Sequence, residues 1–456
     1  MTKFDIIIIG AGPGGYETAV RAAKQGRQVA VVEARRVGGT CLNEGCIPTK
    51  CLCRTAEVLH DVKTADVFGV ETDKTPAFSL KKAIERKDNV VETLVKGVEM
   101  LMRTPGIAFF HGKATFVEAT TMKVELHDGG EEILSAPVII IATGSVSKFL
   151  PIEGAHSRDV LTSTEMLQLT ELPRHLCIIG GGVIGLEFAS IFNAFGSETT
   201  VVEYCKEVLP NLDADIAKRL RTSLKKQGIA FHVGAAVTAI KELSGGGSEV
   251  VFEAKGKQQC VEADIVLMAV GRAANVASLN LADVGIDFTP RGIKVDEHFA
   301  TNIPGIYAIG DVNGICPLAH AATFQGYSVL DHLFGTTKRP IDTSLVPSAV
   351  FTVPEMASVG LTEEACQARE MEYSVKKAFY RANGKSLSMG SDEGLVKLIV
   401  GTDDKLLGCH ILGAHAADIV HEATLLMALG GTVADLSQTI HAHPTLSEVL
   451  LAAAAE

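Results

Sequence analysis

The same strand–glycine–helix–strand pattern occurs twice in this chain, and this repeat constrains the fold more than any other feature. The first copy begins with the apolar run at residues 6–9, and the second begins with residues 177–179. Equivalent residues, such as Gly10 and Gly180, lie 170 positions apart without a gap. The glycines of the two G-x-G-x-x-G motifs are Gly10, Gly12 and Gly15 in the first copy, and Gly180, Gly182 and Gly185 in the second.

The spacing of each copy predicts a dinucleotide site. The first glycine permits a tight turn, the second lets the backbone approach a pyrophosphate, and the third lets the helix pack on the strand. The pyrophosphate then lies at a helix N-terminus, where free N–H groups favour anions. Glu33 and Glu203 end the second strands, each 18 residues after the last glycine, where a carboxylate can bind a ribose. One such motif is weak evidence, and two glycine turns without a ligand remain the alternative.

Two dinucleotide sites indicate a flavin that exchanges a hydride with a nicotinamide, so we expect FAD and NAD as cofactors. Glu203 favours NAD over NADP, because its carboxylate would repel a 2′-phosphate. Residues 204–207 offer no arginine pair, although Lys206 supplies one cation.

Three later apolar runs, at residues 138–141, 265–270 and 306–309, are predicted strands that end in small or polar residues. Such ends suit the approach of a ligand or of another backbone segment. Asp311 follows the last run and could accept a hydroxyl of the flavin polyol chain. An ordinary turn or helix-capping aspartate is the alternative.

Cys41 and Cys46 are close enough in sequence to form a disulfide in a small loop. Such a loop adds little stability, so in a reducing compartment the pair is better explained as a redox couple. If one helix runs through this region, Lys50 lies one turn after Cys46, where a cation would stabilise a thiolate or a reduced flavin. Cys51 and Cys53 keep a zinc site open as an alternative, but we interpret them as small buried residues.

A histidine-rich motif near the C-terminus predicts an acid–base group. Glu448 follows His443 by five residues, across Pro444, which we expect to start a helix. A glutamate in that first turn could bond to the imidazole and fix its tautomer. A histidine that accepts a thiol proton suits thiol–disulfide exchange. The alternative is that His441 or His443 only caps the helix.

Composition excludes several classes of protein. The 456 residues are 47% hydrophobic and 21% charged, which suits about three folded domains rather than a disordered chain. Lys and Arg total 42 against 54 for Asp and Glu, so no nucleic-acid partner is expected. No apolar run approaches the roughly 18 residues of a membrane span. Residues 1–9 lack the pattern of a signal or transit peptide, which predicts a cytoplasmic location.

Taken together, the Cys-x4-Cys segment, the two nucleotide motifs and residues 441–448 resemble the flavin-dependent pyridine nucleotide–disulfide oxidoreductases. The resemblance covers residues 6–448 and is strongest to the dihydrolipoamide dehydrogenase branch of the family. Residues 407–413 also resemble part of the interface domain of that branch. Four positions depart from the usual pattern, among them the cysteines Cys51 and Cys53. Thr49 replaces a frequent serine, and Glu44 stands where an apolar residue is common. A carboxylate at Glu44 would raise nearby thiol pKa values if it faced them.

The resemblance implies roles for the catalytic residues. Cys46 would be the thiol that touches the flavin, and Cys41 the thiol that exchanges with substrate. His443 would be the acid–base residue, oriented by Glu448 and contributed by the partner subunit of a homodimer. No metal is implied.

The resemblance also implies cofactor contacts, among them a pair between Lys50 and Glu187 beside the flavin ring. FAD would be held by Gly10, Gly12, Gly15, Glu33, Gly39, Thr40, Lys50, Ala114, Thr143, Gly144, Ser145, Asp311, Pro317, Leu318, Ala319 and His320. NAD would be held by Gly180, Gly182, Gly185, Glu187, Glu203, Val237 and Gly271.

We therefore expect an α/β fold with two Rossmann-like domains, one inserted in the other, and a C-terminal α+β dimerisation domain. The expected boundaries are 1–146 for FAD binding, 147–270 for NAD binding, 271–338 for a central FAD-associated segment and 339–456 for dimerisation. The expected activity is the NAD-linked oxidation of dihydrolipoamide on the lipoyl domains of a 2-oxoacid dehydrogenase or glycine-cleavage system. Alternatives are another disulfide or metal reductase, or a non-enzymatic relative. Glu203 opposes the NADPH that a glutathione reductase would use.

Overall fold

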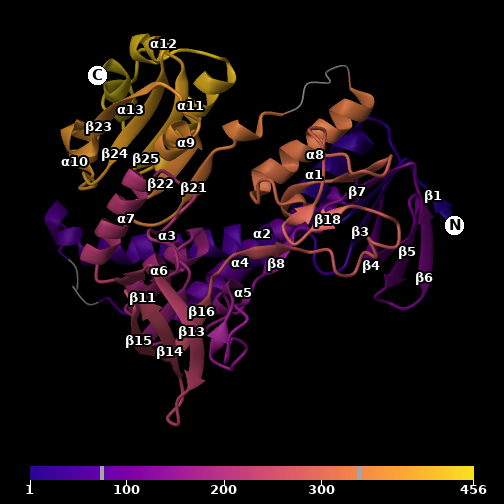
Figure 1. The fold of residues 1–456 in the computed structure, drawn as a ribbon, viewed down its shortest axis with the longest axis horizontal. Helices are drawn as coiled ribbons and strands as arrows, with labels where there is room; N and C mark the ends of the chain where they lie inside the picture. Colours follow the sequence, from indigo (N-terminus) through magenta and orange to yellow (C-terminus); the bar gives the residue numbers. More distant parts are fainter. Residues whose placement is uncertain (72–75, 336–340) are drawn as a thin grey trace. The chain divides into compact units, whose positions relative to one another are not determined.

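The computed structural model describes residues 1–71, 76–335 and 341–456, and it divides into two compact units (Figure 1). Unit 1 consists of residues 1–51, 84–148 and 271–343, and unit 2 consists of residues 52–83, 149–270 and 344–456. Residues 149–270 thus interrupt unit 1, as expected for one dinucleotide domain inserted in another. The boundary expected between residues 338 and 339 lies outside the described residues, and the other boundaries stay predictions.

The core of unit 1 is a sheet in the order β1-β6-β5-β4-β3-β2-β7-β20. Neighbouring strands from β4 to β20 pair in parallel, and every residue of β2 is buried. A parallel sheet covered on both faces explains why β2 is a continuous apolar run rather than an alternating one. The strands are β1 (Thr2–Lys3), β2 (Ile6–Ile9), β3 (Val29–Glu33), β4 (Ile107–Glu118), β5 (Thr121–Leu126), β6 (Glu131–Ser135), β7 (Val138–Ile141) and β20 (Ile306–Ala308).

Two helices of unit 1, α1 (Pro13–Lys24) and α8 (Ala319–Phe334), run side by side (Figure 1). A Cβ at Gly326 of α8 would lie 1.8 Å from Thr18 Oγ1 of α1, so only glycine permits this approach. The remaining elements of this part of the chain are α2 (Gly39–Glu44), α3 (Cys46–Lys63), α4 (Leu80–Leu101), β18 (Phe288–Thr289), β19 (Gly292–Ile293) and the 3₁₀ turn η2 (Gly310–Asn313).

Unit 2 contains a second parallel sheet, in the order β12-β11-β10-β16-β9, and an antiparallel sheet of β13, β14 and β15. The strand expected at 265–270 ends at Met268. Ala269 still donates its N–H to the Ile179 carbonyl oxygen of β10, and the chain bends at Val270. These elements are β9 (Val160–Leu161), α5 (Ser163–Met166), β10 (His175–Ile179), α6 (Val183–Phe195), β11 (Glu198–Glu203), α7 (Ala214–Lys226), β12 (Ala230–Val233), β13 (Ala235–Glu242), β14 (Ser248–Ala254), β15 (Lys257–Ala263) and β16 (Ile265–Met268).

The insertion leaves and re-enters unit 1 through two short strands, β8 (Ser145–Ser147) and β17 (Arg272–Ala274), which pair with each other antiparallel. This pairing places both ends of the insertion at one point of unit 1.

The C-terminal part of unit 2 is an antiparallel sheet in the order β21-β22-β25-β24-β23. Helices α11 and α13 lie over this sheet and bury an apolar core against it (Figure 1). The predicted fold class, including this α+β domain, is confirmed. The elements are β21 (Ser348–Val350), β22 (Met356–Gly360), α9 (Glu363–Ala368), β23 (Tyr373–Phe379), α10 (Gly384–Ser388), β24 (Leu395–Gly401), β25 (Leu406–Leu412), α11 (Ala416–Ala428), α12 (Val433–Gln438) and α13 (Glu448–Ala455). No helix in the described ranges is long and apolar enough to cross a membrane.

Candidate active site

The first glycine motif forms the turn from β2 into α1. Gly10 has a φ of +104°, and a Cβ there would lie 2.4 Å from the carbonyl oxygen of Ala142. A Cβ at Gly15 would lie 1.9 Å from the carbonyl oxygen of Gly10, so the third glycine lets the helix pack on the strand. At Gly12 the nearest atom would be 3.8 Å away, which leaves room where the pyrophosphate is expected.

The second motif repeats this geometry between β10 and α6. Gly180 has a φ of +111°, and a Cβ there would lie 2.4 Å from the carbonyl oxygen of Ala269. A Cβ at Gly185 would lie 2.0 Å from the carbonyl oxygen of Gly180. Nothing lies within 4 Å of a Cβ at Gly182. Both turns therefore have the shape that a bound dinucleotide requires.

The acidic residues at the strand ends are held in the same way in both copies. Glu33 accepts a hydrogen bond from the N–H of Ala11 at 2.7 Å and one from the N–H of Arg35 at 2.7 Å. Glu203 accepts the equivalent pair of bonds in the second copy. Its donors are the N–H groups of Gly181 and Cys205. Each carboxylate keeps further lone pairs for ribose hydroxyls, so the residues present fit two dinucleotides.

Ser145 and Asp311 of the predicted flavin site are in direct contact. The Ser145 hydroxyl donates to Asp311 Oδ2 at 2.6 Å. Arg272, which the sequence analysis did not assign to the site, donates to Ser145 Oγ and to the Ser145 carbonyl oxygen, both at 2.7 Å. Burial holds the pKa of Arg272 below its ordinary value, while the charges of Asp311 and Glu44 act in the opposite direction. In the sequence, Arg272 directly follows Gly271 at the end of a predicted strand, and this position could have assigned Arg272 to the site.

The other residues predicted to hold FAD lie at different depths of unit 1. Thr143 donates its hydroxyl to the Asn275 carbonyl oxygen at 2.7 Å, and Gly144 has a φ of +69°. Ala114 on β4 is buried in the core. Pro317 and Leu318 lead into α8, and Ala319 and His320 are its first two residues.

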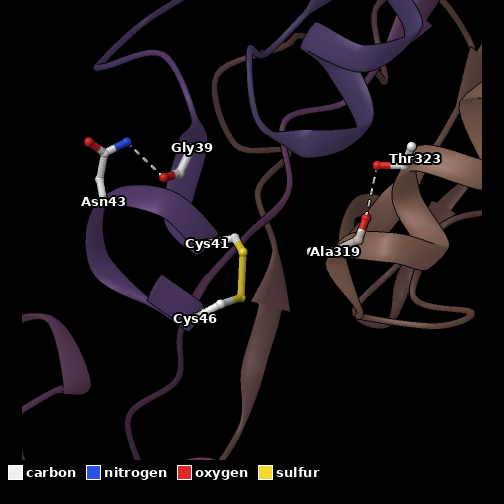
Figure 2. Close-up of a disulfide and its surroundings, with 6 residues drawn as sticks. All are labelled: Gly39, Cys41, Asn43, Cys46, Ala319 and Thr323. Atoms are coloured by element: carbon white, nitrogen blue, oxygen red, sulfur yellow. Dashed lines mark hydrogen bonds between the residues drawn. A yellow bond between two sulfur atoms is a disulfide. The ribbon is translucent and has the colours of Figure 1, made fainter. Parts of the chain in front are cut away.

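The redox pair lies where α2 meets α3 (Figure 2). Cys41 and Cys46 form a disulfide with their Cα atoms 4.7 Å apart, which confirms the predicted pairing. Asn43 donates its side-chain amide to the Gly39 carbonyl oxygen at 2.9 Å, which holds the short helix in shape. Cys46 and Lys50 both lie in α3, four residues apart, so Lys50 follows Cys46 by about one helical turn.

The backbone around the pair approaches the first glycine motif closely. A Cβ at Gly39 would lie 2.6 Å from the Cα of Gly12. Thr40 follows Gly39 in the first turn of α2. The predicted pyrophosphate turn and the redox helix therefore belong to one rigid arrangement.

Cys51 and Cys53 are buried on α3, as interpreted from the sequence. The Cys53 thiol donates to the Phe351 carbonyl oxygen at 3.3 Å. In the ranges that the structure covers, no group of three or more His, Cys, Asp or Glu side chains is placed to hold a metal ion.

His443 and Glu448 are hydrogen-bonded, Nδ1 to Oε1, at 3.0 Å. Glu448 Oε2 also accepts the Thr445 N–H at 2.8 Å, and these two bonds lower the pKa of Glu448. The expectation that the helix starts at Pro444 is wrong, because α13 begins at Glu448. The Thr445 carbonyl oxygen accepts a hydrogen bond from the side-chain amide of Asn383 rather than a helical backbone bond.

His441 has different surroundings. Its side chain is 3% exposed, against 80% for His443. Nδ1 lies 2.9 Å from the Thr439 carbonyl oxygen, and Nε2 lies 3.2 Å from Glu422 Oε1 on α11. Glu422 is not part of any sequence motif, so its contact with His441 could not be predicted from the sequence.

The remaining residues predicted near NAD are divided between the two units, with Glu187 and Val237 in unit 2 and Gly271 in unit 1. Glu187 on α6 is 3% exposed, and its carboxylate accepts the Phe351 N–H at 3.0 Å. Val237 lies at an irregularity of β13 and packs against the domain core. Gly271 of unit 1 has a φ of +104°, and nothing lies within 4 Å of a Cβ there. The predicted pair between Lys50 and Glu187 stays a prediction.

Comparison with known proteins agrees with this arrangement. Residues 4–326 match the family model "Pyridine nucleotide-disulphide oxidoreductase", and residues 346–454 match its dimerisation domain, which supports a homodimer. The chain is 39% identical to dihydrolipoyl dehydrogenase of Bacillus subtilis (strain 168), covering 98% of this chain and 97% of the relative. It is 38% identical to leghemoglobin reductase of Glycine max, covering 99% and 87%.

A solved structure, the Cu(II) complex of the HOCl-induced flavoprotein disulfide reductase RclA from Escherichia coli, superposes with a TM-score of 0.89. That protein is 32% identical, with 100% of this chain and 99% of the other covered. The chain belongs to the pyridine nucleotide–disulfide oxidoreductase family, close to the lipoamide dehydrogenases, and is an oxidoreductase that uses FAD and NAD.

Proposed function

We propose that the protein oxidises protein-bound dihydrolipoamide to lipoamide and passes the electrons to NAD⁺. The observation that carries the proposal is the Cys41–Cys46 disulfide, because a dithiol substrate requires a partner disulfide for exchange. Full-length similarity to dihydrolipoyl dehydrogenases supports lipoamide as the substrate. The partners would then be the lipoyl domains of a 2-oxoacid dehydrogenase or of a glycine-cleavage system.

The proposed exchange begins with a proton transfer to His443. Its Nδ1–H donates to Glu448, so Nε2 is left as the proton acceptor. The substrate thiolate attacks Cys41, the bond between Cys41 and Cys46 breaks, and Cys46 leaves as a thiolate. The second substrate thiol then attacks the mixed disulfide and releases Cys41. The substrate gains an S–S bond, the protein loses one, and two electrons and two protons move to the protein. In the dimer, His443 would come from the second copy.

Bound FAD would accept the electron pair from the cysteines and supply the hydride that reduces NAD⁺. This chain supplies Glu33 and Glu203 to fix the two riboses, and the Lys50 cation one helical turn after Cys46 to stabilise its thiolate.

A second candidate is a disulfide reductase that acts on another substrate. The similarity to RclA over the whole chain favours it. Steady-state rates would separate the two functions, with dihydrolipoamide and NAD⁺ in one assay and glutathione disulfide or Cu(II) with NADH in others. Lipoamide turnover should exceed the other rates by orders of magnitude. Preferred reduction of glutathione disulfide or Cu(II) would contradict the proposal.

A further inference from the structure

Glu44 belongs to the same short helix as Cys41. It is the last residue of α2 and lies three residues after Cys41. Residues three apart on a helix are neighbours, with Cβ atoms about 5–6 Å apart. The Glu44 side chain is only 21% exposed, so water screens its charge incompletely. On its own, this carboxylate would disfavour the Cys41 thiolate, which is the form that exchanges with disulfides.

Arg35 binds this carboxylate with both ends of its guanidinium group. Nη1 donates to Glu44 Oε2 at 3.2 Å, and Nη2 donates to Oε1. Two parallel bonds between a guanidinium and a carboxylate give a well-defined geometry. The Arg35 side chain is 68% exposed and would otherwise be free to rotate in water.

The main chain of Arg35 is fixed on both sides. Its N–H donates to Glu33 Oε1, and its carbonyl oxygen lies 2.7 Å from Nε2 of His111. These two bonds fix the position from which the Arg35 side chain reaches Glu44. Arg35 thus connects the acid that ends β3 to the end of the redox helix.

The second copy of the repeat has no guanidinium at the position of Arg35. The residue equivalent to Arg35 is Cys205, which makes the same backbone bond to its acid. The charge of Glu44 also acts to raise the pKa of Arg272, but the hydrogen bonds of Arg272 go to Ser145. Arg35, in contrast, uses its guanidinium group to bind Glu44.

We propose that Arg35 is a positioning residue for the redox pair: it holds the Glu44 carboxylate and cancels its charge, so that the Cys41 thiolate forms readily. The inference rests on the proposed use of the Cys41–Cys46 pair in thiol–disulfide exchange. It does not depend on which dithiol is the substrate. The reaction itself is unchanged, because the charge alters only how easily the reduced Cys41 thiol gives up its proton.

The test is the pH dependence of Cys41 alkylation by iodoacetamide in the reduced holoprotein, followed by mass spectrometry of the Cys41 peptide. In Arg35→Ala the uncompensated carboxylate should raise the pH midpoint of alkylation by up to about one unit, which slows the reaction at pH 7 by up to about tenfold. Glu44→Gln should lower the midpoint, since the guanidinium then acts alone. The double variant should return close to the wild-type midpoint, because both charges are gone.

Arg36 provides the matched control. It is the next residue, is 47% exposed and pairs with Glu92 on α4. Arg36→Ala should leave the midpoint unchanged, and added salt should shrink the effect of Arg35→Ala. An unchanged midpoint in Arg35→Ala, or a shift that Glu44→Gln fails to reverse, would overturn the proposal. If lipoamide turnover is absent while these shifts are present, the proposed substrate is wrong and the role of Arg35 stands.

Discussion

The two dinucleotide motifs of this chain share their scaffold and differ in the loop that follows. Glu33 and Glu203 bind the same two backbone positions, 170 residues apart in sequence. After Glu33, the chain presents Arg35 to the redox helix. After Glu203, it presents Glu207, whose Oε2 accepts from Arg221 Nη2 at 2.9 Å on α7 of the same domain.

The difference shows where a duplicated fold acquires separate roles. The strands and glycine turns are kept because each is required for backbone packing at the nucleotide site. The loop after the second strand is not constrained in this way, so its side chains can have different functions in the two copies. In the first copy the loop leads directly to the disulfide, and in the second it closes an ion pair within its own domain.

The largest effects are expected at the third glycines. Gly15→Ala places a methyl group 1.9 Å from the Gly10 carbonyl oxygen, which should push α1 from its strand and abolish FAD binding and all activity. Gly185→Ala causes the same clash in the second copy and should leave a yellow protein whose KM for NADH is at least about tenfold higher. Flavin absorbance and NADH kinetics distinguish them. A colourless Gly185→Ala protein that is still folded would reverse the assignment of the two motifs.

Cys46→Ser should remove one activity and spare another. Dihydrolipoamide oxidation should be lost, because the exchange needs both thiols of the disulfide. Transfer from NADH to a dye should remain, because it uses the two nucleotide sites without the thiols. Wild-type turnover of dihydrolipoamide in this variant would show that the pair is not the electron relay.

The elements and the redox pair could be predicted from sequence because their signals are local. The apolar runs of β2 and β10 end in glycines, and Cys41 and Cys46 are five residues apart. The partners in contacts between distant segments could not be predicted in this way. Asn383 donates to Thr445 across 62 residues, and Arg272 donates to Ser145 across 127 residues.

His443→Gln tests the proton acceptor, which belongs to neither nucleotide motif. FAD content and dye reduction should stay nearly intact, while lipoamide chemistry falls by about 10²–10⁴-fold, the usual contribution of a positioned general base. Glu448→Gln should act in the same direction but less, and the two effects should not add, because the residues act as one unit.

His441→Gln is the control for this prediction. Its ring is buried against Glu422, so the variant should lower the melting temperature while reducing lipoamide turnover much less than His443→Gln. Thermal unfolding and steady-state kinetics measure the two effects separately. A greater loss of turnover in His441→Gln would mean that the acid–base role belongs to the other histidine.

The smallest effects concern the choice between NAD and NADP, and they separate the two acids of the repeat. Wild-type protein should prefer NADH, because Glu203 is buried, is fixed by two backbone bonds and would repel a 2′-phosphate. Glu203→Gln removes the repulsion and a charged hydrogen bond to the ribose, so the ratio of kcat/KM for NADH over NADPH should fall about tenfold or more. Glu207→Gln should lower the ratio less, by releasing Arg221 from its partner.

Glu33→Gln is the matched change in the first copy. It should weaken FAD retention and leave the ratio unchanged, since the Glu33 carboxylate contacts the flavin nucleotide. A ratio that responds to Glu33 as strongly as to Glu203 would mean that the two sites are not separate, and a wild-type preference for NADPH would remove the electrostatic argument altogether.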